Sequence, residues 1–181
     1  MDEDIRLIED HLSGRDGALD ELVVKYQKMI FGLTYRMTHD VEDAKDLTQK
    51  TFLQAFRGLG NFRRDASFKT WLYQIAINTC ISHVRKKGYD EREVDDTIAG
   101  EQQGALSELI EKEKKEYIKE CLSSLPERQR AALVLRVYEG LSCAETASVM
   151  GCSEGAVKAH YHHAVKKLRN LFAEKGYEVR T

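Results

Sequence analysis

The sequence has little of what breaks, cross-links or anchors a chain. Proline occurs once, at Pro126, and none of the 4 cysteines forms a CxxC pair. No close cysteine–histidine spacing of the zinc-binding kind is present, so we expect no metal site and no cofactor. We expect reduced, mostly buried thiols at Cys80, Cys121, Cys143 and Cys152. No apolar run approaches the roughly 20 residues of a membrane-spanning helix.

An excess of charge of one sign is also missing. The chain of 181 residues has 28 Lys and Arg against 30 Asp and Glu, for a net charge of −2. Local patches govern nucleic-acid affinity more than net charge does, and here residues 85–87 and 158–169 are basic whereas residues 90–101 are acidic. The N-terminal segment MDEDIRLIED is acidic and amphipathic, unlike a secretory signal, so we expect a cytoplasmic protein.

Abundant aliphatic, Lys, Glu and Arg residues with a single proline predict an all-α fold. In the first half, apolar residues at helical spacing predict helices over about 5–12, 19–37, 41–57 and 68–86, the third with Val41 inside. Asp40 and Ser67 are the expected N-caps. The fourth helix is apolar nearly all round, which is typical of the central helix of a bundle.

The second half begins after an acidic segment. Residues 88–105 carry 6 acids and 1 arginine, which predicts a flexible acidic linker over 89–106 between domains 1–88 and 107–181. A helix resumes near Leu106. The stretch from 125 to 172 then predicts three helices, the first from Pro126 to Gly140 with Tyr138 on its buried face.

The last two of these helices carry clear end signals. Ser142 and Glu145 form a capping-box pair for the second helix, on which we expect Ala144 to face inward. Gly151 ends that helix, and Ser153 caps the third with Glu154 in its first turn.

A short helix, a glycine-containing turn and a basic second helix together predict a helix-turn-helix. In that motif the second helix enters the DNA major groove, and residues near its N-terminus contact base edges. The basic outer face, which could also be simply solvated, carries Lys158, His162, His163, Lys166 and Arg169. Lys158, Ala159 and His162 are the expected base contacts.

Two stretches resemble one known family. DAKDLTQKTFLQAFRGLGNFRRDASFKTWLYQIAINTCISHVRKK resembles region two of bacterial sigma factors, and the stretch from 125 to 172 resembles region four. The chain length and the missing middle domain resemble the extracytoplasmic-function branch, group IV. A helix-turn-helix alone would not single out sigma factors, but its combination with DLTQKTF and FKTWLYQIAIN does.

The resemblance implies partners and contact residues. The partners are core RNA polymerase, through its β′ clamp helices and β flap, promoter DNA and an anti-sigma factor, with no direct membrane insertion. The residues that match the family's core-binding positions are Asp46, Gln49 and Phe52. Those that match its minus-ten positions are Asn61, Phe62, Arg63, Arg64, Lys69, Trp71 and Asn78. Those that match its minus-thirty-five positions are Ser153, Glu154, Lys158, Ala159, His162, His163 and Lys166.

The physical chemistry of the minus-ten residues fits capture of a melted base. Such a base is held by stacking and by contacts to its exposed edge. Phe62 and Trp71 offer rings, and Asn78 both donates and accepts hydrogen bonds. From the residues alone, Trp71 could equally belong to the core, Phe62 could anchor its loop, and Asn78 could be a paired polar residue between helices.

Three functions remain to be compared. The first is an initiation factor that binds core polymerase and directs it to a promoter. The second is a two-domain helix-turn-helix regulator that binds an operator without polymerase. The third is a nuclease that uses Asp40, Asp43 and Asp46, although these acids are better explained as a cluster at a helix start. No glycine-rich phosphate loop or nucleophile–base pair is evident, so we expect no enzyme.

Overall fold

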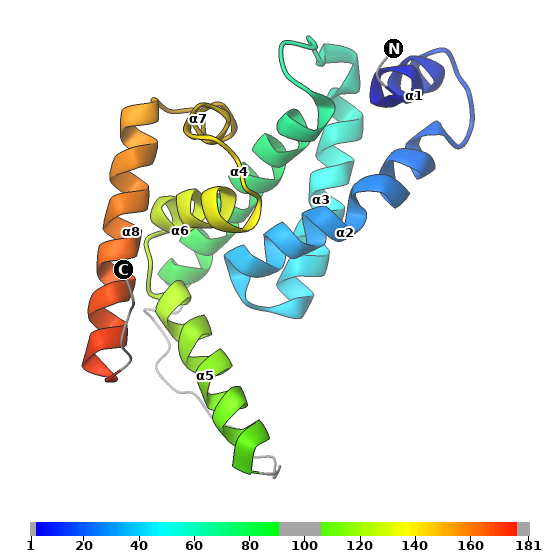
Figure 1. Ribbon diagram of the computed structural model, residues 1–181. Helices are drawn as coiled ribbons and strands as arrows, with labels where there is room; N and C mark the ends of the chain where they lie inside the picture. Colours follow the sequence, from blue (N-terminus) through cyan, green and yellow to red (C-terminus); the bar gives the residue numbers. More distant parts are fainter. Residues whose placement is uncertain (1–2, 91–105, 177–181) are drawn as a thin grey trace.

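The computed structural model describes residues 3–90 and 106–176, without the side chains of 88–90 and 106–112. Over these residues the fold is all-α, as predicted, and contains no strand. The first group of helices is α1 (Glu3–Leu12), α2 (Ala18–Thr38), α3 (Val41–Gly58), the short 3₁₀ helix η1 (Leu59–Asn61) and α4 (Phe68–Asp90). The second is α5 (Leu106–Ser123), α6 (Glu127–Leu133), the π-helical turn η3 (Val134–Tyr138), α7 (Cys143–Met150) and α8 (Glu154–Glu174) (Figure 1).

The predicted N-terminal caps are confirmed. The side chain of Asp40 accepts a hydrogen bond from the Asp43 amide at 2.9 Å, and Ser67 accepts one from the Thr70 amide at 3.1 Å. These side chains satisfy amides that have no partner inside the helix. Ser142 and Glu145 form both bonds of the predicted capping box. The predicted acidic linker falls mainly on residues 91–105, which lie outside the described residues.

The helix after Pro126 departs from its prediction. It is α-helical only to Leu133 and then widens into a π turn, in which the Glu139 amide bonds the Val134 carbonyl at 3.2 Å. A wider turn changes which side chains share a face, and this is why Tyr138, expected to be buried, is 48% exposed. Val41 and Ala144, also expected inside, are exposed because they stand in the first turns of α3 and α7.

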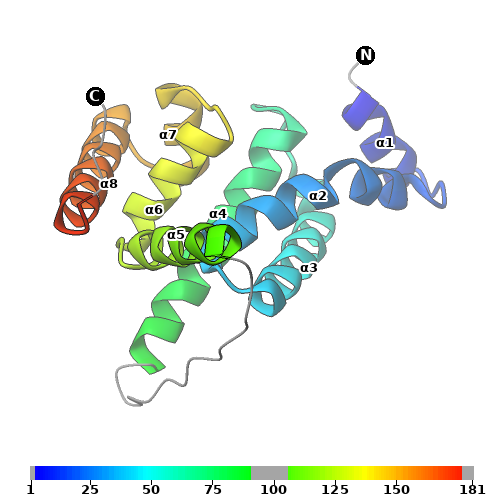
Figure 2. The same ribbon diagram turned by 60° about the horizontal axis from the view of Figure 1, so that its bottom comes forward.

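The two groups of helices pack directly on each other. α4 lies against α2 and α3 on one side and against α6 and α7 on the other, whereas α5 projects from the body of the molecule (Figures 1 and 2). One continuous core of buried residues runs from α1 through α4 to Val157 of α8. A smaller apolar cluster holds α8 against α6 and the end of α5, and consists of Leu122, Leu125, Leu133 and Ala164.

Several polar side chains bridge these groups, among them Arg130 and Glu139. Arg130, which is 5% exposed, donates to the Met37 carbonyl at 2.5 Å and to the Ser123 carbonyl at 2.5 Å. The Glu139 carboxylate accepts hydrogen bonds from the Tyr73 hydroxyl at 2.5 Å and from Arg36 at 3.2 Å. Burial, together with this carboxylate, raises the pKa of Tyr73, so its hydroxyl remains a donor. The described structure is therefore closed, with each half buried partly by the other.

Candidate functional site

An apolar groove runs between α2 and α3. Its cavity of about 600 Å³ is lined by Val23, Gln27, Lys28, Phe31, Lys45, Thr48, Gln49, Phe52, Leu53 and Phe56. Two of the three predicted core-binding residues, Gln49 and Phe52, line it. Phe52 is only 6% exposed and packs on Phe56 at a centroid distance of 5.9 Å, so it forms part of the floor. Asp46 does not line the cavity and lies exposed one turn earlier on α3.

The groove also takes residues that the sequence reasoning missed. Phe31 of α2 lines it and stacks on Tyr35, with centroids 6.3 Å apart, yet Phe31 lies outside the buried stripe predicted for α2. An aromatic side chain outside a buried stripe was the available signal. An apolar floor flanked by Lys28 and Lys45 suits the apolar face of a partner helix with acidic flanks.

The loop after α3 is held by an aromatic cluster. The centroid of the Phe62 ring lies 5.0 Å from that of Trp71 and 6.0 Å from that of Phe68. Phe68 is fully buried, whereas Phe62 and Trp71 are half-buried. Trp71 also closes against Gly58, where an added Cβ would lie 3.2 Å from its Cζ2 atom. The two outer rings therefore anchor the loop and still reach its surface.

A cavity of about 290 Å³ opens beside these rings. It is lined by Asn61, Phe62, Arg63, Arg64, Asp65, Ala66, Thr70, Trp71, Gln74 and Ser148. Five of the seven predicted minus-ten residues are brought together here. The other two, Lys69 and Asn78, are exposed but do not line it. The Nζ atom of Lys69 instead lies over the Tyr73 ring, 5.6 Å from the ring centroid.

Thr70, Gln74 and Ser148 were not among the predicted site residues. Gln74 stands one turn before Asn78 on α4, so the polar seam formed by these two side chains was the signal in the sequence. Ser148 comes from α7 of the second group, and only the packing of the two groups brings it to this cavity.

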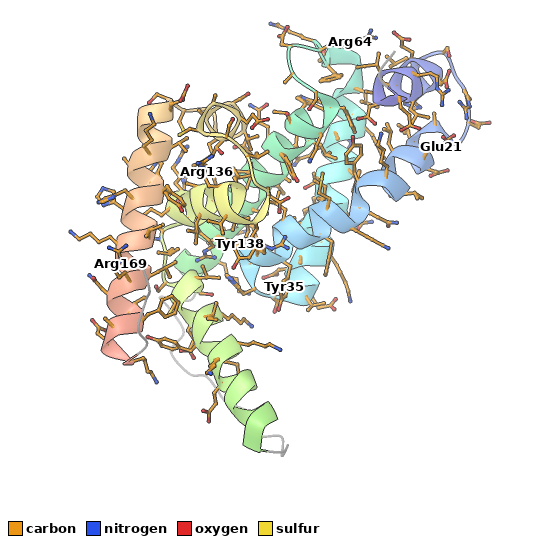
Figure 3. The ribbon with its side chains drawn as sticks, viewed as in Figure 1. Glu21, Tyr35, Arg64, Arg136, Tyr138 and Arg169 are labelled. Carbon is orange, nitrogen blue, oxygen red and sulfur yellow. The ribbon has the colours of Figure 1, made fainter. Side chains whose placement is uncertain are left out.

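Arg64 has an unusual position in this loop. Its φ of 63° lies in the left-handed region, and its guanidinium pairs with Glu9 of α1 at 2.9 Å. Figure 3 shows Arg64 on the loop beside α1. No ion pair is found for the neighbouring Arg63 among the described residues, and Arg63 is exposed.

The outer face of α8 is a separate surface. The Ser153 side chain caps α8 by accepting from the Ala156 amide at 3.2 Å, which leaves Glu154 in the first turn. Val157 and Ala164 are buried on the inner face. The remaining predicted minus-thirty-five residues are all exposed: Lys158, Ala159, His162, His163 and Lys166. Arg169 extends this face outward, away from the rest of the molecule (Figure 3).

Two of the three acids that suggested a nuclease, Asp40 and Asp43, are used structurally. Asp40 caps α3. Burial opposes ionisation of Asp43, but a hydrogen bond from Lys87 at 2.9 Å and the His83 imidazole, whose Nε2 lies 3.1 Å from the carboxylate, outweigh it and lower its pKa. Within residues 3–90 and 106–176 no cluster of three or more His, Cys, Asp or Glu side chains could hold a metal ion. Over the same residues no helix has the length and apolarity of a membrane span.

Comparison with known proteins identifies both halves. The family model described as sigma-70 region 2 matches residues 22–89, and the model described as sigma-70, region 4 matches residues 115–168. The RNA polymerase sigma-H factor of Pseudomonas aeruginosa is 38% identical over 175 residues, which is 91% of each chain. The ECF RNA polymerase sigma-E factor of Escherichia coli K12 is 34% identical over 175 residues, again 91% of each.

Solved structures share the fold. CnrH, solved in complex with the cytosolic domain of CnrY, has a TM-score of 0.69 at 24% identity over 96% of this chain and 99% of its own. The sigma factor RpoE of Bartonella quintana, solved with the anti-sigma factor NepR, has a TM-score of 0.65 at 24% identity over 85% and 96%. Neither a regulator that acts without polymerase nor a nuclease explains why both sigma-70 region models match, or why sigma factors align over 91% of their length. The chain belongs to the extracytoplasmic-function sigma factors, the DNA-binding subunits that direct bacterial RNA polymerase to initiate transcription at promoters.

Proposed function

We propose that three surfaces divide the work of initiation between them. The α2–α3 groove docks on the β′ clamp helices of core polymerase, the loop after α3 captures the melted minus-ten strand, and the outer face of α8 reads the minus-thirty-five duplex. Residues 1–88 and 107–181 act as the two domains, the second also meeting the β flap. The observation that carries the proposal is the cavity beside Phe62 and Trp71, which combines an aromatic wall with the exposed guanidinium of Arg63.

The minus-ten cavity has the features that a single strand requires. A ring that is anchored on one side and exposed on the other can stack a base, and such stacking is worth roughly 1–3 kcal/mol per base. Phe62 and Trp71 are rings of this kind. Gln74 and Asn78 offer amide groups to a base edge, while Arg63 and Lys69 offer charge to the phosphates.

The minus-thirty-five face of α8 follows the helix-turn-helix pattern. Residues of its first turns face the groove floor in that motif, which favours base contacts for Lys158, Ala159 and His162. Lys166 lies two turns further along, where it can meet only the phosphate backbone. His163 and the capped first turn at Ser153 and Glu154 flank this contact.

The core-binding groove supports docking of a helix. Its floor is apolar, with Phe52 almost fully buried, and Leu53 on its edge is 48% exposed. An exposed leucine beside a groove is the kind of anchor that a partner helix covers. Gln49 on the wall and Asp46 one turn away supply the polar contacts that set the partner's register.

The closed arrangement must open on a promoter. The names of the two elements place them about 25 base pairs apart, roughly 85 Å along the duplex at about 3.4 Å a pair. A compact chain of this length is only about 40 Å across. The packing of α4 on α6 and α7 is therefore broken when both elements are bound, and the contacts of Glu139 and Arg130 break with it.

The neighbouring structures bear on the partners. CnrH was solved with CnrY, and RpoE with the anti-sigma factor NepR. We extend this to the present chain: it is held by an anti-sigma factor and acts, without catalysis, in the cytoplasm where core polymerase and DNA are.

A promoter-melting assay tests the minus-ten part of the proposal. We expect Phe62→Ala and Asn78→Ala to reduce open-complex formation on linear duplex promoter DNA. A template with a mismatched minus-ten region should rescue Phe62→Ala if that ring assists melting. It should rescue Asn78→Ala poorly, because a base-edge contact is needed on either template. Normal permanganate footprints for both variants, with core binding intact, would remove this loop and Asn78 from the mechanism.

A further inference from the structure

The segment between α3 and α4, residues 59–67, is called the minus-ten loop, and contacts hold it on two sides. On its inner side Phe62 packs against Phe68 and Trp71. On its outer side Arg64, held at a φ of 63°, pairs with Glu9 of α1 at 2.9 Å. A non-glycine residue keeps a left-handed conformation only when its surroundings hold it there. The ion pair with Glu9 contributes to that hold.

The partner of Arg64 stands on a well-fixed helix. Asp4 of α1 is 5% exposed and accepts hydrogen bonds from the Tyr26 hydroxyl and from Lys25, the latter at 2.6 Å. Leu7 and Ile8 of the same helix are buried in the core against α2. Glu9 follows directly and is 40% exposed, so its carboxylate reaches the surface from a rigid base.

Arg63, between the two fastened residues, is exposed and has no ion pair in the described part of the chain. The guanidinium of Arg64 is occupied by Glu9, whereas that of Arg63 is available to a phosphate. The two adjacent arginines thus have different roles, which their sequence alone does not separate.

We propose that Glu9 is a positioning residue for minus-ten recognition: through Arg64 it fixes the loop so that Phe62, Asn61 and Arg63 meet the strand. The proposal rests on the proposed function of the loop. Arg64 then acts through the loop conformation and not as a phosphate contact. α1, which lies beyond the matched region 2 segment of 22–89, becomes part of the promoter-reading machinery.

A charge-swap cycle tests this role. The full chain with core polymerase is assayed as Glu9→Arg, Arg64→Glu and the double variant, on a template pool randomised at the minus-ten element. The pair is 47% and 40% exposed, so we expect each single variant to lose up to about fivefold in discrimination among minus-ten sequences. The double variant, which keeps the net charge, should return to within about twofold of the unaltered chain, since the pair is re-formed.

A matched control comes from the neighbouring pair of Arg15 and Glu21. These side chains are 2.7 Å apart and 48% and 50% exposed, and neither forms a hydrogen bond or ion pair with residues 59–67. Glu21→Arg should leave minus-ten preference unchanged, so a change caused by added positive charge alone would appear in both series. Figure 3 shows Glu21 at the start of α2, apart from the loop that carries Arg64.

Two results would overturn the proposal. One is an Arg64→Glu defect that Glu9→Arg does not rescue, because Arg64 would then contact the DNA itself. The other is a Glu9→Arg variant with unaltered preference. If Phe62→Ala is also without effect on open-complex formation, the loop does not capture the minus-ten strand. If Phe62→Ala is defective while Glu9→Arg is normal, only the positioning role is rejected.

Discussion

The contact of Glu139 with Tyr73 and Arg36 should control how firmly the two halves pack. The Glu139 side chain is 9% exposed and Tyr73 is 1% exposed, so the hydrogen bond between them is shielded from water. Arg36 is 38% exposed, and its contribution is reduced by solvent screening. A hydrogen bond to a charged group contributes roughly 1.5–3 kcal/mol, and loss of one partner leaves the other unsatisfied. We therefore expect Glu139→Ala to weaken the packing by about 2–4 kcal/mol.

Such a change should be visible as local opening. A free-energy change of about 2–4 kcal/mol lowers the ratio of closed to open molecules by roughly 30- to 1,000-fold. Hydrogen exchange of amides in α6, α7 and the facing part of α4 should accelerate by this factor if they exchange through separation of the halves. Glu139→Gln keeps an acceptor for Tyr73 and should show a smaller effect. The exposed Glu120→Gln on α5 is the control for loss of one carboxylate.

The same variant gives a functional readout. If the halves separate on a promoter as proposed, Glu139→Ala should raise transcription when core polymerase is in excess over the chain. Exchange rates in α6 and α7 that match those of the unaltered chain would show that Glu139 does not hold the halves together. A loss of transcription with faster exchange would show that this contact is needed within the initiation complex, against the reasoning above.

Three further predictions concern pH and the two partner surfaces. Burial lowers the pKa of His39 to about 4. The unfolded chain therefore takes up this proton first, and up to about 3 kcal/mol of stability should be lost as pH falls from about 6.5 to 4. His39→Asn, which tolerates the left-handed backbone at this position, should flatten that decline in urea unfolding measured across this pH range. Lys158→Ala should cost roughly 1–3 kcal/mol of binding free energy and relax preference at one minus-thirty-five position, whereas Lys166→Ala should weaken binding to all sequences equally. Binding titrations in which Lys158→Ala also weakens all sequences equally would exclude base reading by Lys158. Joint replacement of Asp46 and Gln49 by alanine should preserve helicity by circular dichroism and weaken competition with another sigma factor for core; unchanged competition would exclude them as contacts.

Local chemistry in the sequence was enough to predict most helix ends. Asp40, Ser142 with Glu145, and Ser153 each act on amides within three residues, so no knowledge of packing was needed. The π turn after Leu133 was not foreseen, because nothing in the local residue types distinguishes it from a continuing α-helix. The exposure of Tyr138 follows from that turn and was missed for the same reason.

The candidate surfaces show the same difference between contacts that are local in sequence and contacts that depend on packing. Phe62 and Trp71 lie close in sequence around one loop, and the structure brings them into contact as rings that both anchor and line the cavity. The pairing of Arg64 with Glu9 joins residues far apart in the chain, as does the bridge from Glu139 to Tyr73. Such pairs depend on how helices are placed relative to one another, which periodicity and caps do not specify.

Transcription by purified core polymerase tests the division of labour most directly. The polymerase is given a template pool randomised at both promoter elements, with and without the chain, and the transcripts are sequenced. With the unaltered chain we expect a defined pair of elements to be enriched, and none without it. Asn78→Ala should relax only the minus-ten preference, and Lys158→Ala only the minus-thirty-five preference. Enrichment that is unchanged by both substitutions, or relaxed at the opposite element, would contradict the assignment of these two surfaces.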